Sequence, residues 1–489
     1  MEQINEISQI VKDCVSSNVF IGLIIVVSLY FSIRMIFPQF RFFGKMISTL
    51  LEKDDKSDKG ISPFQGFAIA LGSRVGVGNV AGIATAIATG GPGAIFWIWI
   101  FGLIGSAVAI VEAVLGQAYK EKRGDEYLGG PAYYIKKGIK NPFISKYLSI
   151  IFAVLAIIGM GVLLPGVQSN TVVNSIEHAF HTDKTATVIV AAIGIAFIIW
   201  GGIKRIGKVE AYLTPLKCFL YLAFSIVVIA HHWNLIGDVF YTIISSALGV
   251  HPIFGGILGS AIAMGIRRGI FSTDVGYGPG GSFAAAARCN HPMKQGLLQG
   301  LSVLLSTLII CTATALIILM SGSCQVVDIS TNSTIYTGAL FPGVHAGAEW
   351  VQAGLDSCEV LEGWAPGVLA FLIAIFALGT IVGYYYLIES NLKFLVKKEN
   401  KILINFIKVV FLVTMVASTL IEAEFIWNLA DIGMGLMGWI NILVLVALSP
   451  KAISIVKDYA KDIKQGNKLV FKPEKYGIKD ETNAWKLEE

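Results

Sequence analysis

The chain has 489 residues, of which 55% are hydrophobic and only 15% are charged, and its formal net charge is +5. A soluble fold of this length cannot bury so much apolar surface, so the composition excludes an ordinary water-soluble protein and predicts an all-α, multi-pass protein of the cell membrane. The positive charge lies in loops and at the C-terminal end, without a basic stripe interleaved with aromatic residues. A lipid bilayer rather than a nucleic acid is therefore the expected partner.

Apolar stretches of about 20 residues, the length that crosses a bilayer, recur along the whole chain. The first lacks the basic start and the small-residue cleavage site of a signal peptide, so we interpret it as a retained helix. By this length criterion we count about eleven spans: 18–37, 63–90, 92–118, 146–177, 185–203, 211–231, 252–288, 294–321, 364–390, 402–421 and 425–449.

The loops between the spans predict the orientation, because Lys and Arg collect on the cytoplasmic side of a membrane. The long loop 322–363 has acidic residues but no Lys or Arg, which is typical of the outer side. The N-terminus is therefore expected outside and the C-terminus in the cytoplasm. The loops that then fall inside are all basic: 38–62, 119–146, 202–210, 288–294 and 391–401.

Two of the spans are interrupted near their middle. The first, 63–90, brings together Gly72, Arg74, Gly76, Gly78 and Asn79, with apolar sequence on both sides. The second, 252–288, is broken between 267 and 280 by arginine, glycine, aspartate and proline. Open backbone and buried charge are costly in a bilayer, so these positions suit a binding site better than a passive anchor. Close helix packing is the alternative role for the glycines.

The two broken spans divide the chain into similar halves. Five spans lie in 63–232 and five in 250–449, and each set begins with a broken span. Because five is an odd number, the two sets have opposite orientations, which predicts a 5+5 inverted repeat with two discontinuous helices. Residues 1–62 then add one extra N-terminal helix and a cytoplasmic linker, and residues 450–489 form a cytoplasmic tail. Paired broken spans of this kind point to the midplane binding site of a secondary transporter.

The residues of the breaks favour a zwitterionic ligand together with a hard cation. Unwound backbone between Gly72 and Gly78 offers carbonyl oxygens to Na⁺, and the half-helix that begins near Asn79 presents N–H groups to a carboxylate. Arg74 and Asp274 lie in opposite breaks and are expected to act as a structural or gating pair. Direct contact of Arg74 with a substrate carboxylate is the alternative.

Polar residues in other parts of the chain each have two interpretations. Gln168 either contacts a polar group of the ligand or bonds a neighbouring helix. Thr380 either bonds its own helix or completes a Na⁺ site. Cys324 and Cys358 share the outer loop, and the sequence leaves open whether they are bonded. The cysteines and histidines show no metal-binding or catalytic spacing, so neither an enzyme nor a cofactor is expected, and Na⁺ enters only as a coupling ion.

Several motifs resemble the alanine or glycine:cation symporter family, also called the sodium:alanine symporter family, within the superfamily that has the leucine-transporter-like fold. The first motif is similar to that family's signature almost throughout, and the others follow in the expected order across roughly 63–449. The motifs are SRVGVGNVAGIATAIATGGPGAIFW (73–97), VQSN (167–170), RRGIFSTDVGYG (267–278), GTIVGYYYLIE (379–389) and DIGMGLMGWIN (431–441).

The resemblance implies Na⁺-driven or H⁺-driven uptake of a small neutral amino acid, alanine or glycine, by alternating access. It implies a sodium ion held by the carbonyls of Gly72 and Val75 with the hydroxyl of Thr380. The residues implied to line the substrate site are Ser73, Gly76, Gly78, Asn79, Gln168, Phe271 and Ser272.

Two departures from the family pattern put details in question. After Phe271 the family usually has SNEAGLGS, where this chain has Ser272, Thr273, Asp274 and then Val-Gly-Tyr-Gly-Pro. Before Thr380 the family tends to have serine, where this chain has Gly379 and so lacks one hydroxyl that could bind sodium. These departures are expected to affect which cation and which substrate the protein binds.

The function expected from the sequence is therefore import of alanine or glycine with Na⁺ by a symporter. An H⁺-coupled or broader neutral amino-acid transporter is the alternative. A membrane sensor or channel is the competitor from another class, although a channel is expected to show charged rings or a repeated filter. The chain has no GxxxxGK[ST] loop for ATP. Stoichiometry, stereochemical preference and oligomeric state are not encoded in any pattern we recognise.

Overall fold

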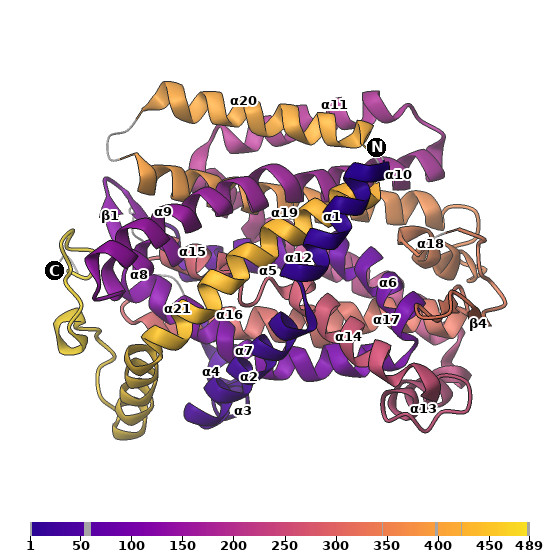
Figure 1. Cartoon of the computed structure of the whole chain (residues 1–489), viewed down its shortest axis with the longest axis horizontal. Helices are drawn as coiled ribbons and strands as arrows, with labels where there is room; N and C mark the ends of the chain where they lie inside the picture. Colours follow the sequence, from indigo (N-terminus) through magenta and orange to yellow (C-terminus); the bar gives the residue numbers. More distant parts are fainter. Residues whose placement is uncertain (1, 53–59, 345, 397–399, 422, 487–489) are drawn as a thin grey trace.

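The computed structural model describes residues 2–52, 60–344, 346–396, 400–421 and 423–486, most of which are helical (Figure 1). Seven helical stretches of this part are long and apolar enough to cross a membrane, and a bent pair within 63–90 raises the number to eight. The helical, multi-pass architecture expected from composition is confirmed. The seven are Glu6–Arg34, Gly93–Ala118, Pro142–Phe180, Gly202–His231, Pro292–Ser321, Ala365–Leu395 and Phe425–Gln465.

The long helices correspond to eight of the expected spans. Their elements are α1 (Glu2–Val15) with α2 (Asn18–Arg34), α5 (Pro63–Arg74) with α6 (Ala81–Gly90), α7 (Gly93–Ala118), α9 (Pro142–Ile158) with α10 (Leu164–Phe180), α12 (Gly202–His231), α16 (Pro292–Leu304) with α17 (Thr312–Ser321), α19 (Ala365–Leu395) and α21 (Ala423–Gln465). The last of these continues past the expected end of its span, through Pro450, to Gln465.

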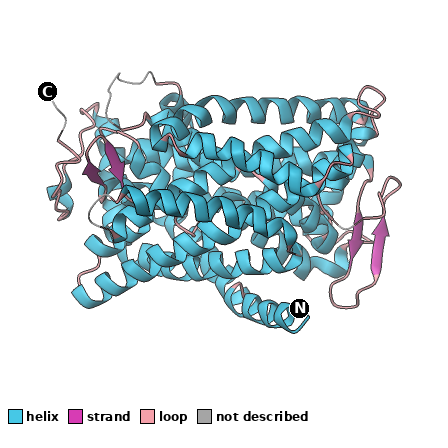
Figure 2. Ribbon diagram, turned by 90° about the horizontal axis from the view of Figure 1, so that it is seen from above, coloured by secondary structure: helices cyan, strands magenta, loops and turns pink. Residues whose placement is uncertain are grey.

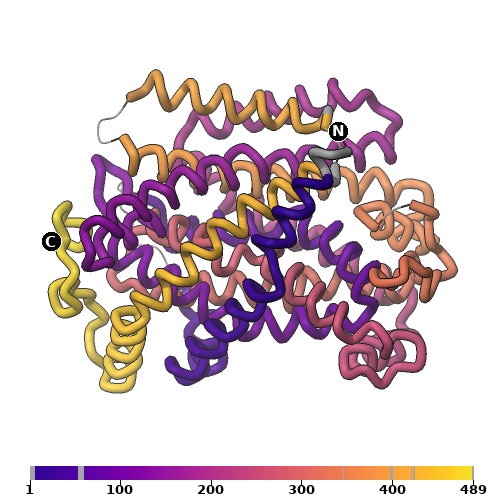
Figure 3. Tube along the Cα trace, viewed as in Figure 1, coloured from indigo at the N-terminus to yellow at the C-terminus, as the bar shows by residue number. Residues whose placement is uncertain are grey.

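Three expected spans form helices that do not meet the same length and hydropathy test. They are α11 (Lys184–Ile199), α20 (Lys401–Ala417) and the second interrupted stretch, which consists of α14 (Leu258–Thr273) and α15 (Pro279–Ala286). The α11 and α20 helices pack on each other along one edge of the bundle (Figure 3). The total of eleven spans therefore stays a prediction.

Short elements connect the long helices. The helices among them are α3 (Pro38–Arg41), α4 (Phe43–Leu50), α8 (Pro131–Gly138), α13 (Ile236–Ala247) and α18 (Ala348–Asp356). Two antiparallel hairpins, β1 (Glu121–Arg123) with β2 (Glu126–Leu128) and β3 (Gln325–Val327) with β4 (Thr334–Thr337), lie at opposite ends of the bundle (Figure 2). The basic loop and the acidic loop that the charge pattern distinguishes are thus at opposite ends of the molecule.

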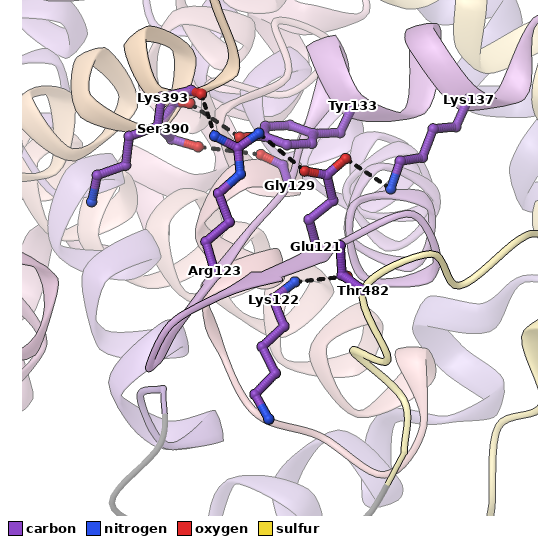
Figure 4. Close-up of polar contacts among 9 residues, drawn as sticks. All are labelled: Glu121, Lys122, Arg123, Gly129, Tyr133, Lys137, Ser390, Lys393 and Thr482. Carbon is purple, nitrogen blue, oxygen red and sulfur yellow. Dashed lines mark hydrogen bonds and ion pairs between the residues drawn. The ribbon is translucent and has the colours of Figure 1, made fainter. Parts of the chain in front are cut away.

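Polar contacts fasten the basic end of the bundle. Arg123 of β1 donates to the carbonyl oxygen of Lys393 at the end of α19 (2.5 Å) and to Glu121 (3.2 Å), which also pairs with Lys137 of α8 at 3.0 Å (Figure 4). The backbone N–H of Lys122 donates to Thr482 Oγ1 at 2.9 Å. The chain end beyond α21 is therefore attached to the first hairpin.

The end of the chain also packs through aromatic residues. Phe471 is 3% exposed and its ring lies against Trp485. The Lys120 ammonium lies 4.2 Å from the centre of the Trp485 ring, and burial lowers the pKa of Lys120 to about 8. A cation held over an indole is favourable and offsets part of that burial cost.

At the other end of the bundle, Cys324 and Cys358 are free thiols, and burial raises the pKa of Cys324 to about 12.

The two interrupted stretches meet in the centre of the bundle. Helix α14 packs on α6, and α15 packs on α5, so each half of one stretch lies against a half of the other. Helix α7 contacts α14, α15 and α16, while α12 and α19 pack on α5 (Figure 1). Residues far apart in the sequence are brought together at these breaks.

Candidate functional site

The first break separates α5 from α6. A capping box between Ser62 and Gln65 starts α5, and the helix ends at Arg74. After Arg74 the chain forms a short 3₁₀ turn, η1 (Val77–Asn79), and the two parts of the stretch bend by 56°. Such an interruption frees backbone groups from the helical pattern and is tolerated in a membrane only where the protein itself surrounds it.

The glycines of this break allow close approach of two other helices. A Cβ built on Gly76 would lie 2.4 Å from Thr380 Oγ1 of α19, and one on Gly78 would lie 3.1 Å from the Phe271 ring of α14. The glycines therefore bring α19 and α14 against the unwound backbone. This is the packing role of glycine.

Side-chain amides hold the freed backbone N–H groups. The N–H of Gly76 donates to Asn79 Oδ1 at 3.2 Å, and the N–H of Val77 donates to Gln168 Oε1 of α10 at 3.3 Å. Both amide side chains are buried. Asn79 and Gln168 thus accept hydrogen bonds from two adjacent N–H groups of the break, and their contact with a substrate stays a prediction.

The nitrogen of Asn79 links the first break to the second. Asn79 Nδ2 donates to Ser306 Oγ at 2.8 Å and to Cys311 Sγ at 3.3 Å. Ser306 in turn donates to the carbonyl oxygen of Ser272 at 3.4 Å, and Cys311 approaches Ser272 Oγ at 3.9 Å. Four buried polar side chains therefore join the two breaks. The sequence analysis identified Asn79 and Ser272 but missed Ser306 and Cys311.

Ser306 and Cys311 lie on a π-helical segment, η5 (Leu305–Cys311), between α16 and α17. A second one, η2 (Gly159–Leu163), joins α9 to α10 shortly before Gln168. Wider turns of this kind shift the faces of a helix and are frequent at functional sites. A serine within a long apolar stretch was the only available signal for Ser306, and it does not reveal which neighbour the side chain faces.

Aromatic side chains limit the space beside the breaks. The Phe271 ring packs at a tilted angle on Trp427 of α21, with 5.1 Å between ring centres. Phe271 is 7% exposed, and the Arg268 guanidinium lies 5.4 Å from the centre of the Trp427 ring. The predicted substrate residue Phe271 therefore lies where a bulky ligand would collide with rings.

Arg74, at the first break, reaches across to the second break. Its Nε donates to the carbonyl oxygen of Thr273 at 2.7 Å, and its Nη1 donates to Gln299 Oε1 at 2.7 Å and to Ser302 Oγ. It therefore contacts the last residue of α14 rather than forming a direct ion pair with Asp274. The Asp274 carboxylate still acts on the Arg74 charge through space.

A second buried acid supports the same region. Glu112 of α7 accepts hydrogen bonds from the N–H of Gly276 at 3.0 Å and from Asn441 Nδ2 at 2.8 Å. Asp274 and Gly276 have φ of 54° and 88°, in the left-handed region that ends α14. Glu112 and Asp274 together oppose the positive charge of the buried Arg74. The second break is thus held by charge as well as by backbone conformation.

The residues expected to hold sodium also meet at the first break. Thr380 Oγ1 lies within hydrogen-bond distance of three carbonyl oxygens, those of Ser73 at 3.1 Å, Gly72 at 3.4 Å and Phe376 of its own helix at 3.1 Å, and its one proton donates to one of them at a time. Val75 is buried at the C-terminal end of α5. A further group that the sequence did not indicate reaches the same place: Lys217 Nζ of α12 donates to the carbonyl oxygen of Gly72 at 2.8 Å.

The sequence profile of the sodium:alanine symporter family matches residues 1–473. This chain belongs to that family. Its members carry solutes across membranes, so this symporter-family chain is a transporter and not an enzyme.

Relatives of this family member align over nearly their full length. A sodium/proton-dependent alanine carrier protein of Bacillus sp. strain PS3 is 38% identical, over 88% of this chain and 95% of its own. The sodium/alanine symporter AgcS of Methanococcus maripaludis is 32% identical, over 83% of this chain and 86% of its own. GlnT of Bacillus subtilis, regarded as a sodium/glutamine symporter, is 38% identical over 96% and 94%.

Replacement of Gly72 by alanine is expected to lower the folding stability of this symporter-family member. An added Cβ would lie 2.1 Å from Glu210 Oε2 and 2.6 Å from Thr214 Oγ1, so these two buried side chains of α12 must shift and lose their present contacts. Overpacking of a tight core costs about 1–3 kcal/mol. Folded yield and thermal unfolding in detergent measure the effect. Gly194→Ala is the matched control, because nothing lies within 4 Å of a Cβ there, and equal losses in both variants would contradict the packing argument.

Proposed function

We propose that this chain is a secondary symporter that imports a small neutral amino acid, alanine or glycine, together with Na⁺. The observation that carries the proposal is the meeting of two broken helices, where Ser306 links the Asn79 side chain of the first break to the backbone carbonyl of Ser272 at the second. Membership of a family of cation-coupled alanine carriers supports the same conclusion.

In this proposal the amino acid lies between the two breaks. Its carboxylate takes the N–H groups of Gly76 and Val77, which now donate to amide oxygens. Oriented N–H groups beside an unwound helix are suited to an anion. The proposed lining is completed by the remaining predicted residues, which are Ser73, Gly78, Asn79, Gln168, Phe271 and Ser272.

The aromatic rings beside the breaks favour a short side chain on the substrate. Phe271 lies against Gly78 on one side and against Trp427 on the other. Ser73 is 2% exposed, and its hydroxyl has no hydrogen-bond partner among the described residues. A buried hydroxyl without a partner is costly, and an ammonium or carboxylate of the ligand would satisfy it.

The proposed Na⁺ position adjoins the substrate. The carbonyl oxygens of Gly72 and Val75 and the hydroxyl of Thr380 supply oxygen ligands, the kind that hard cations prefer. Thr380 already contacts the carbonyls of Gly72 and Ser73. One ion that crosses with each substrate draws about 2.3 kcal/mol from a potential of 100 mV.

Transport by alternating access follows from the proposed 5+5 inverted repeat of 63–232 and 250–449. In that arrangement the eleven spans place the N-terminus outside and the C-terminus in the cytoplasm. The hairpin β1–β2 then marks the cytoplasmic end and β3–β4 the outer end, in agreement with the charges of their loops. Rocking of the two halves about the breaks would expose the site to one side at a time.

Uptake of labelled alanine by proteoliposomes tests the proposal. An inward Na⁺ gradient is expected to drive accumulation, and a K⁺ gradient of the same size is not. Unlabelled glycine is expected to compete, while glutamine should compete poorly because of its longer side chain. Uptake that follows only a pH gradient would instead support H⁺ as the coupling ion. Absence of uptake for all neutral amino acids tested, with folded protein, would contradict the proposal and favour a sensor.

A further inference from the structure

Helix α12 has a group of charged and polar residues that are not among those proposed to bind the substrate or Na⁺. Glu210, Thr214 and Lys217 lie four and three positions apart, which places them on one face of a helix. All three are 0–1% exposed, and that face packs on α5 and α19. Charged groups at membrane depth are rare and usually functional.

The Lys217 ammonium donates a hydrogen bond to one of the carbonyl oxygens proposed to bind Na⁺. Its Nζ donates to the carbonyl oxygen of Gly72 at 2.8 Å and lies 5.7 Å from the centre of the Phe376 ring. An ammonium has three donors, and within the described ranges the bond to Gly72 is its one hydrogen bond. The cation position at the first break therefore already contains a positive charge that is tethered to the chain.

A second acceptor for the ammonium lies close by. Glu210 Oε2 accepts a hydrogen bond from Thr214 Oγ1 at 2.6 Å, whereas Glu210 Oε1 has no partner in the part of the chain that the structure describes. A Cβ built on Gly379 would lie 2.6 Å from Lys217 Nζ and 3.0 Å from Glu210 Oε1. The ammonium and the free carboxylate oxygen thus face the same small space beside Gly379.

Gly379 leaves room for the ammonium beside the break. The Cβ of any other residue there would press on Lys217 Nζ at 2.6 Å. The lysine therefore fills the space that a side chain at position 379 would need, beside the carbonyl of Gly72.

We propose that Lys217 is a tethered competitor of the coupling ion and sets its apparent affinity. The inference rests on the proposed Na⁺ position. When Na⁺ takes the carbonyl of Gly72, the ammonium moves to Oε1 of Glu210. Two positive charges at the same carbonyl repel each other, more strongly in a buried site than in water. Glu210 makes the exchange possible because it accepts the displaced charge.

Replacement of Lys217 by methionine tests this competition, because methionine keeps the bulk and removes the charge. The Na⁺ concentration that gives half-maximal alanine uptake is expected to fall about tenfold, which corresponds to about 1.4 kcal/mol. Glu210→Gln is expected to raise the same concentration, since the displaced ammonium then meets a neutral acceptor. Lys408→Met is the matched control. Lys408 is also a buried lysine, but its ammonium lies over the rings of Trp200 and Tyr385 and not beside the carbonyl of Gly72.

Thermal unfolding in detergent gives a second measurement that does not depend on transport. The Na⁺-dependent rise in unfolding temperature, compared with choline at equal ionic strength, is expected at lower Na⁺ in Lys217→Met than in the wild type. Lys217→Gln provides a second neutral variant if the methionine variant does not fold. An unchanged Na⁺ dependence in the neutral variants, or an equal change in Lys408→Met, would overturn the proposal.

The two proposals fail in different ways. If the wild type imports no amino acid under any gradient, the proposed function is wrong, while the Na⁺ thermal shifts still decide the role of Lys217. If the wild type imports alanine with Na⁺ and Lys217→Met has the same half-maximal Na⁺ concentration, the competition is wrong and the symporter stands.

Discussion

Replacement of Arg74 by methionine is expected to destabilise the protein more than any other single change to the two breaks. Arg74 holds Thr273, Gln299 and Ser302, and its charge opposes those of Glu112 and Asp274. Removal of one partner from a buried set of charges costs about 3–5 kcal/mol. Thermal unfolding in detergent and the fraction of monodisperse protein measure the loss.

A double variant distinguishes lost charge balance from lost packing. Asn tolerates the left-handed conformation that Asp274 adopts, with φ of 54°, so Asp274→Asn removes the charge without backbone strain. Arg74→Met with Asp274→Asn is expected to recover a large part of the stability. Arg205→Met, at an exposed arginine, is the surface control and is expected to stay within about 0.5 kcal/mol of the wild type. Full additivity of the two changes would show that the charges do not interact.

Replacement of Asn79 by alanine is expected to lower alanine uptake roughly 100-fold. The side chain accepts from Gly76 and donates to Ser306 and Cys311, so the change releases both breaks at once. Loss of these three buried hydrogen bonds at about 1 kcal/mol each corresponds to roughly that factor. Initial rates of labelled alanine uptake at several alanine concentrations measure it and separate weaker binding from slower turnover.

Asn174→Ala provides the matched control for Asn79. Asn174 is another amide on a membrane helix, but it bonds Asn170 one turn away at 2.9 Å and only its own helix is affected. Uptake by this variant is expected to remain within about twofold of the wild type, since a side-chain pair within one helix contributes about 0.2–0.5 kcal/mol. Wild-type uptake by the folded Asn79→Ala protein would remove the first break from the proposed site.

The sequence predicted the breaks because their residues are poor choices for a continuous membrane helix. Gly76 and Gly78 beside Arg74 interrupt an apolar stretch, and the structure has a 3₁₀ turn and a 56° bend there. The second break was visible for the same reason, from Asp274 and the glycines that follow it. Local composition reveals where a helix must stop, since open backbone requires protein around it.

The partners across the bundle were not predictable in the same way. Glu210 was assigned to a basic loop at 202–210, although α12 already begins at Gly202. This placed Glu210 outside the span and hid its alignment with Thr214 and Lys217 on one helix face. The arrangement of Arg74 was also only partly foreseen, because a helix-end carbonyl competes with Asp274 as an acceptor. Ser306 faces the breaks through a π-helical segment, whose i→i+5 pattern leaves no mark in a single sequence.

The most direct test of cation-coupled transport is the electrical current that alanine evokes in proteoliposomes adsorbed to a solid-supported membrane. With Na⁺ on both sides, a jump in alanine concentration is expected to produce a transient positive current into the vesicles. The current should disappear when N-methylglucamine replaces Na⁺ and in Asn79→Ala. Alanine uptake without any charge movement, or a current of equal size without Na⁺ at constant pH, would contradict coupling of the amino acid to Na⁺ at the first break.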